Sequence, residues 1–448
     1  MRSNVNSFDS LYAWVVFVQR CINCESEFEL NARMYVCSRC GDLLEIEQST
    51  PLLESVLELA ALWSERRKSD DARDRSGVWR FREFLPFASD DAIVSLGEGN
   101  TPLYDAPRSA DYCGLTSLKL KHQGNNPTGS FKDTGMTVAV TQAQKLGMRL
   151  VACASTGNTA ASLAAYAARA GMLCAILVPE GQVSDAKLAQ ALDYGARVLE
   201  IEGNFDVCMR VIQELAEQSS LYLVNSINPF RIEGQKTVAI ELAEQLDWIV
   251  PDHLVVPGGN LGNSSALGKG FRDLASQGFF AKQPRISVIQ AEGAAPFARF
   301  VERREADFVN EKHPHTLATA IKIGAPVSWK KAWRAVHETD GHVITVSEQE
   351  IADAKAMIGR DGIGCEPASA TTVAGIRKLV SDGAIHKDET VVAVLTGHVL
   401  KDTDYVIKYH NQTLVTDDAQ NIRGTFANSI MRVAARSCAI ESVLKGLT

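Results

Sequence analysis

Between residues 149 and 225 the sequence alternates short apolar runs with longer segments of helical pattern. The short runs indicate strands and the longer segments indicate helices. The expected strands are residues 149–154, 173–179, 197–201 and 221–225, and the expected helices are residues 160–170, 185–194 and 205–218. Strands joined in this way by helices run parallel, so the alternation predicts an open parallel sheet covered by helices.

The chain is long enough for more than one such unit. Its 448 residues are 46% hydrophobic, which suggests two or three domains. A net charge of −8 and a pI near 5.7 argue against a nucleic-acid partner, because a phosphate-binding surface needs clustered Lys and Arg. The apolar run at residues 11–18 is too short to span a bilayer and no cleavage site follows it. We therefore expect a packing segment there, no membrane partner and a cytoplasmic location.

Four of the ten cysteines form two pairs, Cys21-x2-Cys24 and Cys37-x2-Cys40, which are separated by twelve residues. Four thiolates at this spacing can close a tetrahedral, structural zinc site. A ribbon that has lost its metal is the alternative. We expect residues 1–50 to form this zinc-ribbon-like segment and residues 51–448 to form the main region, after a charged linker at 68–75. The other cysteines lie singly and are typical of small buried side chains in a reducing compartment: Cys113, Cys153, Cys174, Cys208, Cys365 and Cys438.

Lys132 lies in the turn-rich stretch NNPTGSFKDTG, residues 125–135. Pro127 and Gly129 break regular structure before it, and residues 134–147 read as a helix, so the lysine lies near a helix N-terminus. The positive end of a helix favours the neutral amine over the ammonium. A pyridoxal phosphate enzyme needs such a lysine to hold its cofactor as a Schiff base and to move protons. A solvated surface lysine is the alternative.

Two further segments lie between an expected strand and an expected helix, the position at which open α/β sheets bind ligands. STGNT, residues 155–159, offers hydroxyls, a glycine and a helix N-terminus that attracts a carboxylate, although a simple capped helix start would look the same. PGGNLGN, residues 257–263, follows the strand 253–256 and has the architecture of a phosphate cradle. Its spacing is neither that of a Walker loop nor GxGxxG.

Two later segments offer polar groups for a ligand. NSINPFRIEGQK, residues 225–236, could receive a phosphate, with Arg231 making a two-pronged contact. A helix-capping loop with exposed charges is the alternative. The strand at 390–395 ends in Thr396, whose hydroxyl could hydrogen-bond a ring nitrogen.

With NPTGSFKDTG, ASTGNTAAS, PGGNLGNSSALGKGF and LTGHVLKD in this order, the chain resembles the threonine synthase family of fold type II pyridoxal phosphate enzymes. The likeness runs from about Ser95 to the C-terminus, and NSINPFRIEGQK and the four-cysteine segment also match. It implies an α/β fold of two open, mostly parallel sheets covered by helices, beside the small N-terminal segment. It also implies a mobile subdomain, residues 121–245, that closes over the site, and a homodimer.

The resemblance assigns a role to each motif. Lys132 would bind pyridoxal 5′-phosphate as a Schiff base, Asn158 would hydrogen-bond the ring hydroxyl, and Thr396 would face the pyridine nitrogen. The residues implied around the cofactor's phosphate are Gly259, Asn260, Leu261, Gly262 and Asn263. The residues implied around the substrate are Ser155, Thr156 and Thr159 at its carboxylate, and Asn225, Ser226 and Arg231 near its phosphate.

The implied reaction converts O-phosphohomoserine and water into threonine and phosphate. The chain departs from the family at two positions beside the cofactor motifs, where Thr134 replaces an arginine and Val399 replaces a glycine. A cysteate synthase or a serine/threonine dehydratase shares the cofactor motifs and is the first rival reading. A regulatory protein built around the four-cysteine segment is the second, but it predicts a lost lysine or glycine loop, and both are intact.

Overall fold

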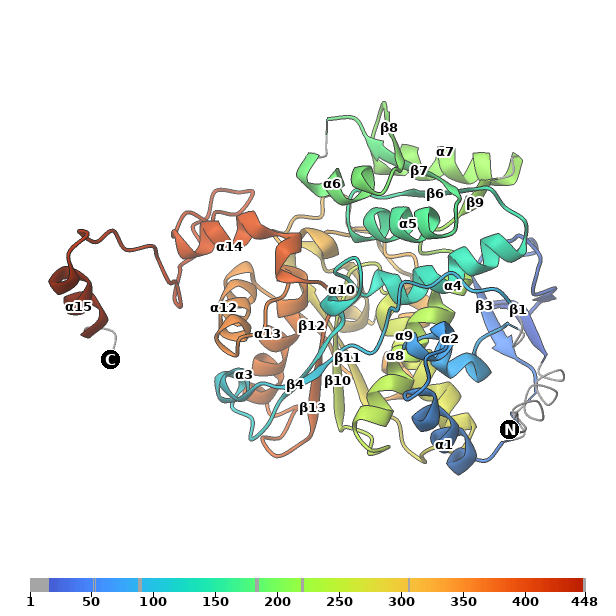
Figure 1. Ribbon diagram of the computed structural model, residues 1–448, viewed down its shortest axis with the longest axis horizontal. Coiled ribbons are helices and arrows are strands. Elements are labelled where there is room, and N and C mark those ends of the chain that lie inside the picture. The colour runs from blue at the N-terminus through green and yellow to red at the C-terminus, as the bar shows by residue number, and fades with distance from the viewer. Residues whose placement is uncertain are drawn as a thin grey trace.

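The structure is a computed structural model that describes residues 16–50, 52, 54–87, 91–181, 185–218, 221–304 and 307–445. Its strands are β1 Phe17–Cys21, β2 Glu27–Phe28, β3 Leu44–Gln48, β4 Leu103–Asp105, β5 Lys119–His122, β6 Leu150–Ala154, β7 Leu173–Pro179, β8 Arg197–Ile201, β9 Leu221–Leu223, β10 His253–Pro257, β11 Arg285–Ala291, β12 Val343–Val346 and β13 Val391–Leu395. They form three sheets (Figure 1).

The helices cover the two larger sheets. They are α1 Val56–Arg66, α2 Ala72–Arg75, α3 Pro107–Cys113, α4 Lys132–Lys145, α5 Asn158–Arg169, α6 Asp185–Asp193, α7 Phe205–Gln218, α8 Pro229–Gln245, α9 Gly262–Ser276, α10 Pro296–Arg303, α11 Trp329–Glu338, α12 Glu348–Arg360, α13 Pro367–Ser381, α14 Thr403–His410 and α15 Ser437–Lys445. Short 3-10 turns lie at Trp79–Phe84, Gln123–Asn125, Glu292–Ala294, Thr319–Ile321 and Val399–Lys401. No helix of the described ranges is both long and apolar enough to cross a membrane.

The six-stranded sheet has the order β12-β11-β10-β13-β5-β4. Its neighbours are parallel except for the edge strand β4, which runs antiparallel to β5. In Figure 1, α12 and α13 lie on one side of this sheet and α8 and α9 on the other. Both central strands, β10 and β13, are buried along their whole length, as expected when helices cover both faces of a parallel sheet.

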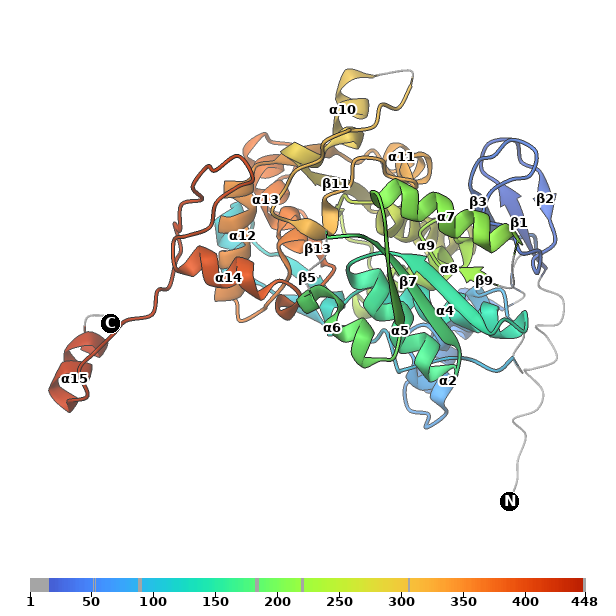
Figure 2. The same cartoon turned by 90° about the horizontal axis from the view of Figure 1, so that it is seen from above.

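The four-stranded sheet has the order β8-β7-β6-β9 and is parallel throughout. Figure 2 shows α5 and α7 on opposite sides of it. This arrangement confirms the alternation predicted for residues 149–225. The last strand ends at Leu223 and not at Asn225. The backbone N–H and carbonyl of Ala154 are bonded by the side-chain amide of Asn225 instead of by backbone groups of a continuing strand.

Two further predicted boundaries were wrong. The helix expected from residue 134 begins at Lys132, so the lysine is part of its first turn. The sequence pattern of residues 50–67 predicts a helix, but the helix begins only at Val56, where Ser55 and Glu58 form a reciprocal capping box. The charged stretch 68–75 contains the short helix α2 and, as expected of a linker, none of its residues is buried.

Two smaller expectations also need comment. Five of the six single cysteines are buried as predicted, but Cys438 is exposed on α15, which extends away from the body (Figure 1). Of the early apolar run, residues 11–15 lie outside the described residues, and Phe17 and Val18 belong to β1.

Helices α4 and α8 cross closely because each has a glycine at the crossing point. A Cβ on Gly135 would lie 2.6 Å from the carbonyl oxygen of Arg231, and a Cβ on Gly234 would lie 1.9 Å from that of Thr134. Neither backbone can move without disturbing its helix. The crossing therefore fixes Arg231 on α8 beside the first turn of α4.

We expect Gly234→Ala to lower the free energy of unfolding by roughly 2–4 kcal/mol, because the added methyl group must push two helices apart. Gly359→Ala is the matched control, since its Cβ would meet nothing within 4 Å. A helical alanine at an open position should stabilise by roughly 0.5–1 kcal/mol. Urea unfolding of both variants measures the difference, and equal midpoints would show that the crossing tolerates a side chain.

Candidate active site

Lys132 is the first residue of α4 and is only partly exposed. Its Nζ lies 4.1 Å from the centre of the Phe131 ring. Burial and, to a smaller extent, the nearby charge of Arg231 lower the pKa of Lys132 to about 7, while Glu366 acts in the opposite direction. A large fraction of this amine is therefore neutral at neutral pH, as a nucleophile or base requires.

The loop that carries Lys132 is held against the end of β13. The N–H of Phe131 donates to the carbonyl of Thr396 at 2.9 Å, and the N–H of His398 donates to the carbonyl of Gly129, also at 2.9 Å. Ser130 and Gly397 form an isolated antiparallel bridge. The structure thus brings Lys132 and Thr396 together from opposite ends of the sequence.

Glu366 is a buried carboxylate at this site that the sequence analysis passed over. Its Oε2 accepts from Asn158 Nδ2 at 3.0 Å, and its Oε1 accepts from Thr396 Oγ1 at 3.0 Å. Burial raises the pKa of Glu366, although both hydrogen bonds oppose the rise. Since Glu366 is the N-cap of α13, the helix dipole also stabilises its charge. A glutamate directly before the Pro367 helix start was the available signal.

The glycine loop between β10 and α9 has the backbone of an anion cradle. Gly258 leaves no room for a side chain, because a Cβ there would lie 2.7 Å from Val288, and Leu261 adopts a left-handed φ of 64°. The first hydrogen bond of the α9 turn runs from Ser265 to Leu261, so the N–H groups of residues 262–264 stay available for an anion.

The polar side chains of the glycine loop are only partly satisfied within the described structure. Asn263 is buried and its Oδ1 has no hydrogen-bond partner there. Asn260 Nδ2 donates to Ser226 Oγ at 2.8 Å, which ties this loop to the predicted substrate-phosphate segment. The free N–H groups fit a bound phosphate group, whereas the Oδ1 of Asn263 is an acceptor and needs a donor from elsewhere.

Arg231, in the first turn of α8, is almost completely buried. Its Nη1 donates to the carbonyl of Val224 at 3.3 Å, and its Nε has no partner in the described structure. Burial lowers the pKa of Arg231 to about 10, and among the described residues no acidic side chain offsets this. A buried cation without a counter-ion indicates that an anionic ligand completes the site.

The other predicted substrate residues lie at the same edge of the four-stranded sheet. Ser155, Thr156 and Thr159 are partly exposed around the start of α5, whose N-cap, Gly157, provides no capping side chain. The side-chain amide of Asn225 stabilises the local fold. It accepts a hydrogen bond from the N–H of Ala154 at 3.0 Å and donates one to the carbonyl of Ala154 at 2.9 Å. Its predicted contact with the substrate stays a prediction.

The four cysteine thiols come together as the spacing predicted. Their Sγ atoms all lie within 4.8 Å of one another, with 3.4 Å between Cys21 and Cys40 and 3.6 Å between Cys24 and Cys37. In a tetrahedral zinc–thiolate site the sulfur atoms are about 3.8 Å apart. The donor set and its spacing therefore fit one structural zinc ion.

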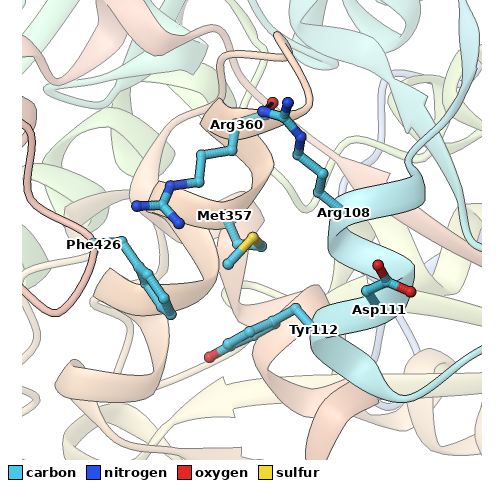
Figure 3. A pocket seen from close by; sticks show the side chains of 6 residues that line it. All are labelled: Arg108, Asp111, Tyr112, Met357, Arg360 and Phe426. Atoms are coloured by element: carbon cyan, nitrogen blue, oxygen red, sulfur yellow. Dashed lines mark hydrogen bonds between the residues drawn. The ribbon is translucent and has the colours of Figure 1, made fainter. Parts of the chain in front are cut away.

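An open hollow of about 610 Å³ lies elsewhere, between α3, α12 and the C-terminal segment (Figure 3). Its lining residues are Arg108, Asp111, Tyr112, Met357, Arg360 and Phe426. None of the residues predicted for the active site borders this hollow. The volume of this hollow is therefore no guide to the position of the active site.

Comparison with known proteins identifies the family. Residues 94–397 match the family described as pyridoxal-phosphate dependent enzyme. The threonine synthase of Methanocaldococcus jannaschii is 45% identical over 90% of this chain and 98% of its own length. The threonine synthase of Methanosarcina acetivorans is 44% identical over 89% of this chain and 95% of its own.

Solved structures show the same fold at lower identity. A fungal L-serine ammonia-lyase from Rhizomucor miehei aligns with a TM-score of 0.61 and 20% identity, over 72% of this chain and 100% of that one. Processed threonine deaminase isoform 2 from Solanum lycopersicum aligns with a TM-score of 0.59 and 19% identity, over 78% and 86%. These two establish the fold type and leave the reaction to the site residues.

Proposed function

This chain belongs to the threonine synthase family of pyridoxal-phosphate dependent lyases, and on that premise we propose that it converts O-phospho-L-homoserine and water into L-threonine and phosphate. The observation that carries the proposal is the buried, unpaired Arg231 beside Lys132. Arg231 is a cation without a counter-ion, and it lies next to the neutral amine of Lys132. This pair suits an amino-acid substrate that carries an anionic group on its side chain.

The residues present fit the cofactor. Lys132 would hold it covalently, the loop from Gly259 to Asn263 would receive its phosphate, and Asn158 and Thr396 would contact its ring. When bound, pyridoxal phosphate draws electrons from the substrate and makes the protons near its Cα acidic. Glu366 accepts a hydrogen bond from both Asn158 and Thr396, so it would orient the two side chains that we propose as ring contacts.

The chain's own residues bind and orient the substrate. Ser155, Thr156 and Thr159 would receive its carboxylate at the start of α5, where free N–H groups favour an anion. Ser226 and Arg231 would receive its phosphate, and Asn225 would keep these groups at the end of β9 through its bonds to Ala154. With the carboxylate site on one side of Lys132 and the phosphate site on the other, the substrate would bind in a single orientation.

Lys132 would then move the protons. Its neutral Nζ would accept a proton from Cα and one from Cβ, and phosphate would leave with the Cγ–O bond electrons. Protons would return to Cγ and Cα, the hydroxyl group of one water molecule would form the new bond at Cβ, and the other proton of that water would go to the departed phosphate. The atoms balance, because the substrate gains one water and loses one phosphate.

Closure of residues 121–245 over the site would exclude other water molecules. One contact between the two sheets is already present, since Lys401 Nζ, after β13, donates to Gln190 Oε1 on α6 at 2.5 Å. A cytoplasmic homodimer is our proposal for the working form, with one zinc ion at the four cysteines.

The test is product formation by purified holoprotein. We expect O-phospho-L-homoserine to yield threonine and phosphate in equal amounts, with little or no phosphate released from O-phosphoserine. Phosphate release from O-phosphoserine alone would favour the cysteate synthase reading. Formation of an oxoacid and ammonia from serine or threonine would favour the dehydratase reading.

Glu366→Ala should weaken cofactor binding about tenfold or more, because two ring contacts lose the acceptor that orients them. The dissociation constant of pyridoxal phosphate, measured by the visible absorbance of dialysed protein, reports the effect without substrate. Glu348→Ala is the control, as this partly buried glutamate at the start of α12 accepts from Leu317 instead. Equal affinities for the two variants would remove Glu366 from the site.

A further inference from the structure

The four-cysteine segment packs against both halves of the body. On one side Leu43 joins the apolar cluster of Leu221 and Leu223 at the edge strand β9. On the other side the segment contacts the helices of the six-stranded sheet: Asp42 pairs with Lys330, the carbonyl of Leu44 accepts from Lys331 Nζ at 2.7 Å, and Glu45 pairs with Arg272 at 3.1 Å. The segment is therefore a bridge between two units.

Tyr35 contacts β9, the strand that leads into the proposed substrate-phosphate segment. It lies two residues before Cys37, and its hydroxyl accepts from the backbone N–H of Leu223 at 2.7 Å. The next N–H, that of Val224, donates to Ala152 on β6, so the N–H of Leu223 faces the open edge of the sheet. Tyr35 caps that edge, and its ring packs edge-on against Tyr222 at 5.9 Å.

The residues that directly follow Leu223 in the chain include the proposed contacts to the substrate's phosphate. The carbonyl of Val224 accepts from Arg231, and Ser226 follows two residues later. Asn260 of the glycine loop donates to Ser226, and its Oδ1 accepts from the N–H of Val327 at 2.7 Å. Val327 lies just before α11, the helix that carries Lys330 and Lys331. Both sides of the bridge thus converge on the hydrogen bond between Ser226 and Asn260.

We propose that Tyr35 is a positioning residue for the substrate's phosphate, and that metal bound to the four cysteines acts on the reaction through Tyr35. A metal ion that holds Cys37 in place restricts the backbone two residues away, which keeps the Tyr35 hydroxyl on Leu223. Without the metal, the edge of β9 and the Arg231 segment lose this restraint. The inference rests on the proposed function only for the identity of the phosphate-bearing substrate.

Tyr35→Phe tests the hydroxyl while keeping the ring. We expect KM for O-phospho-L-homoserine and Kd for inorganic phosphate to rise roughly three- to tenfold, the range of one hydrogen bond, with kcat within about twofold. Amide exchange of peptides covering residues 221–231 should become faster, and the cofactor absorbance should not change. Tyr112→Phe, in the separate hollow of Figure 3, should change none of these quantities.

Metal removal tests the coupling. Stripping zinc with a chelator should raise KM and the exchange rate at 221–231 in the unaltered protein, but change them little further in Tyr35→Phe, because both act on one contact. The proposal would be overturned if the effects of zinc removal and of Tyr35→Phe were additive. It would also be overturned if KM and the exchange rate were unchanged in Tyr35→Phe, or if the purified protein contained no metal. If the unaltered protein forms no threonine, the proposed function fails, while phosphate binding and amide exchange still decide this inference.

Discussion

We expect the Lys132→Ala protein to form threonine about 10⁴-fold more slowly than the unaltered protein, because it lacks the only amine placed to hold the cofactor and to move protons. Threonine formed from O-phospho-L-homoserine under saturating cofactor measures the loss. Lys145→Ala, at the other end of α4, removes a pair with Asp91 and a cation–π contact with Phe87, and should stay within about twofold. A Lys132→Ala protein with a tenth of normal activity would refute this role.

The protonation of Lys132 can be measured without substrate or cofactor. Because burial and Arg231 lower the pKa of Lys132 to about 7, the amine loses its proton at a lower pH than an ordinary lysine. In cofactor-free protein, acylation at Lys132 should rise between about pH 6 and pH 8 and then level off, with half the maximal rate near the pKa. A rate that still climbs steeply above about pH 9 would show an ordinary lysine.

Arg231→Leu should lower kcat/KM about 10³-fold and yet stabilise the ligand-free protein by roughly 1–3 kcal/mol. The activity falls because the substrate's phosphate loses the buried cation that we propose binds it. The stability rises because burial of this charge costs free energy, and no carboxylate among the described residues offsets it. Steady-state kinetics and urea unfolding give the two numbers, and a fall in both would mean that Arg231 is an ordinary structural residue.

Arg80→Leu is the control of opposite sign. Arg80 is also fully buried, but it pairs with Glu244 at 2.9 Å, on the part of α8 farthest along the chain from Arg231. Its removal should lower the free energy of unfolding by roughly 1–3 kcal/mol, because the partly buried Glu244 loses one of its two arginine partners and keeps only Arg67, and should leave KM unchanged. The two variants together separate a functional charge from a structural one.

Much of the fold followed from local sequence pattern. The alternation of apolar runs and helical segments at 149–225 predicted the four-stranded sheet. The close packing at Gly258 and the left-handed Leu261 explain why a glycine-rich turn forms at the start of α9. The cysteine spacing predicted the cluster for the same reason, since each pair closes within one tight turn. In each case the residues that decide the structure are neighbours in the chain.

The parts that were missed depend on contacts between distant residues. Glu366 meets Asn158 across 208 positions, and Tyr35 meets Leu223 across 188. Nothing in the local pattern distinguishes Glu366 from any acidic residue before a helix. The bonds between the Asn225 amide and Ala154 likewise depend on the pairing of β6 with β9, which brings the two residues together.

The most direct test of the account is to find where the cofactor is attached. Borohydride reduction of the holoprotein, followed by proteolysis and mass spectrometry, should place a single phosphopyridoxyl group on Lys132. A group on another lysine, or none, would contradict the assignment of the active site. Labelling of Lys132 in a protein that forms no threonine would instead preserve the site and refute the reaction.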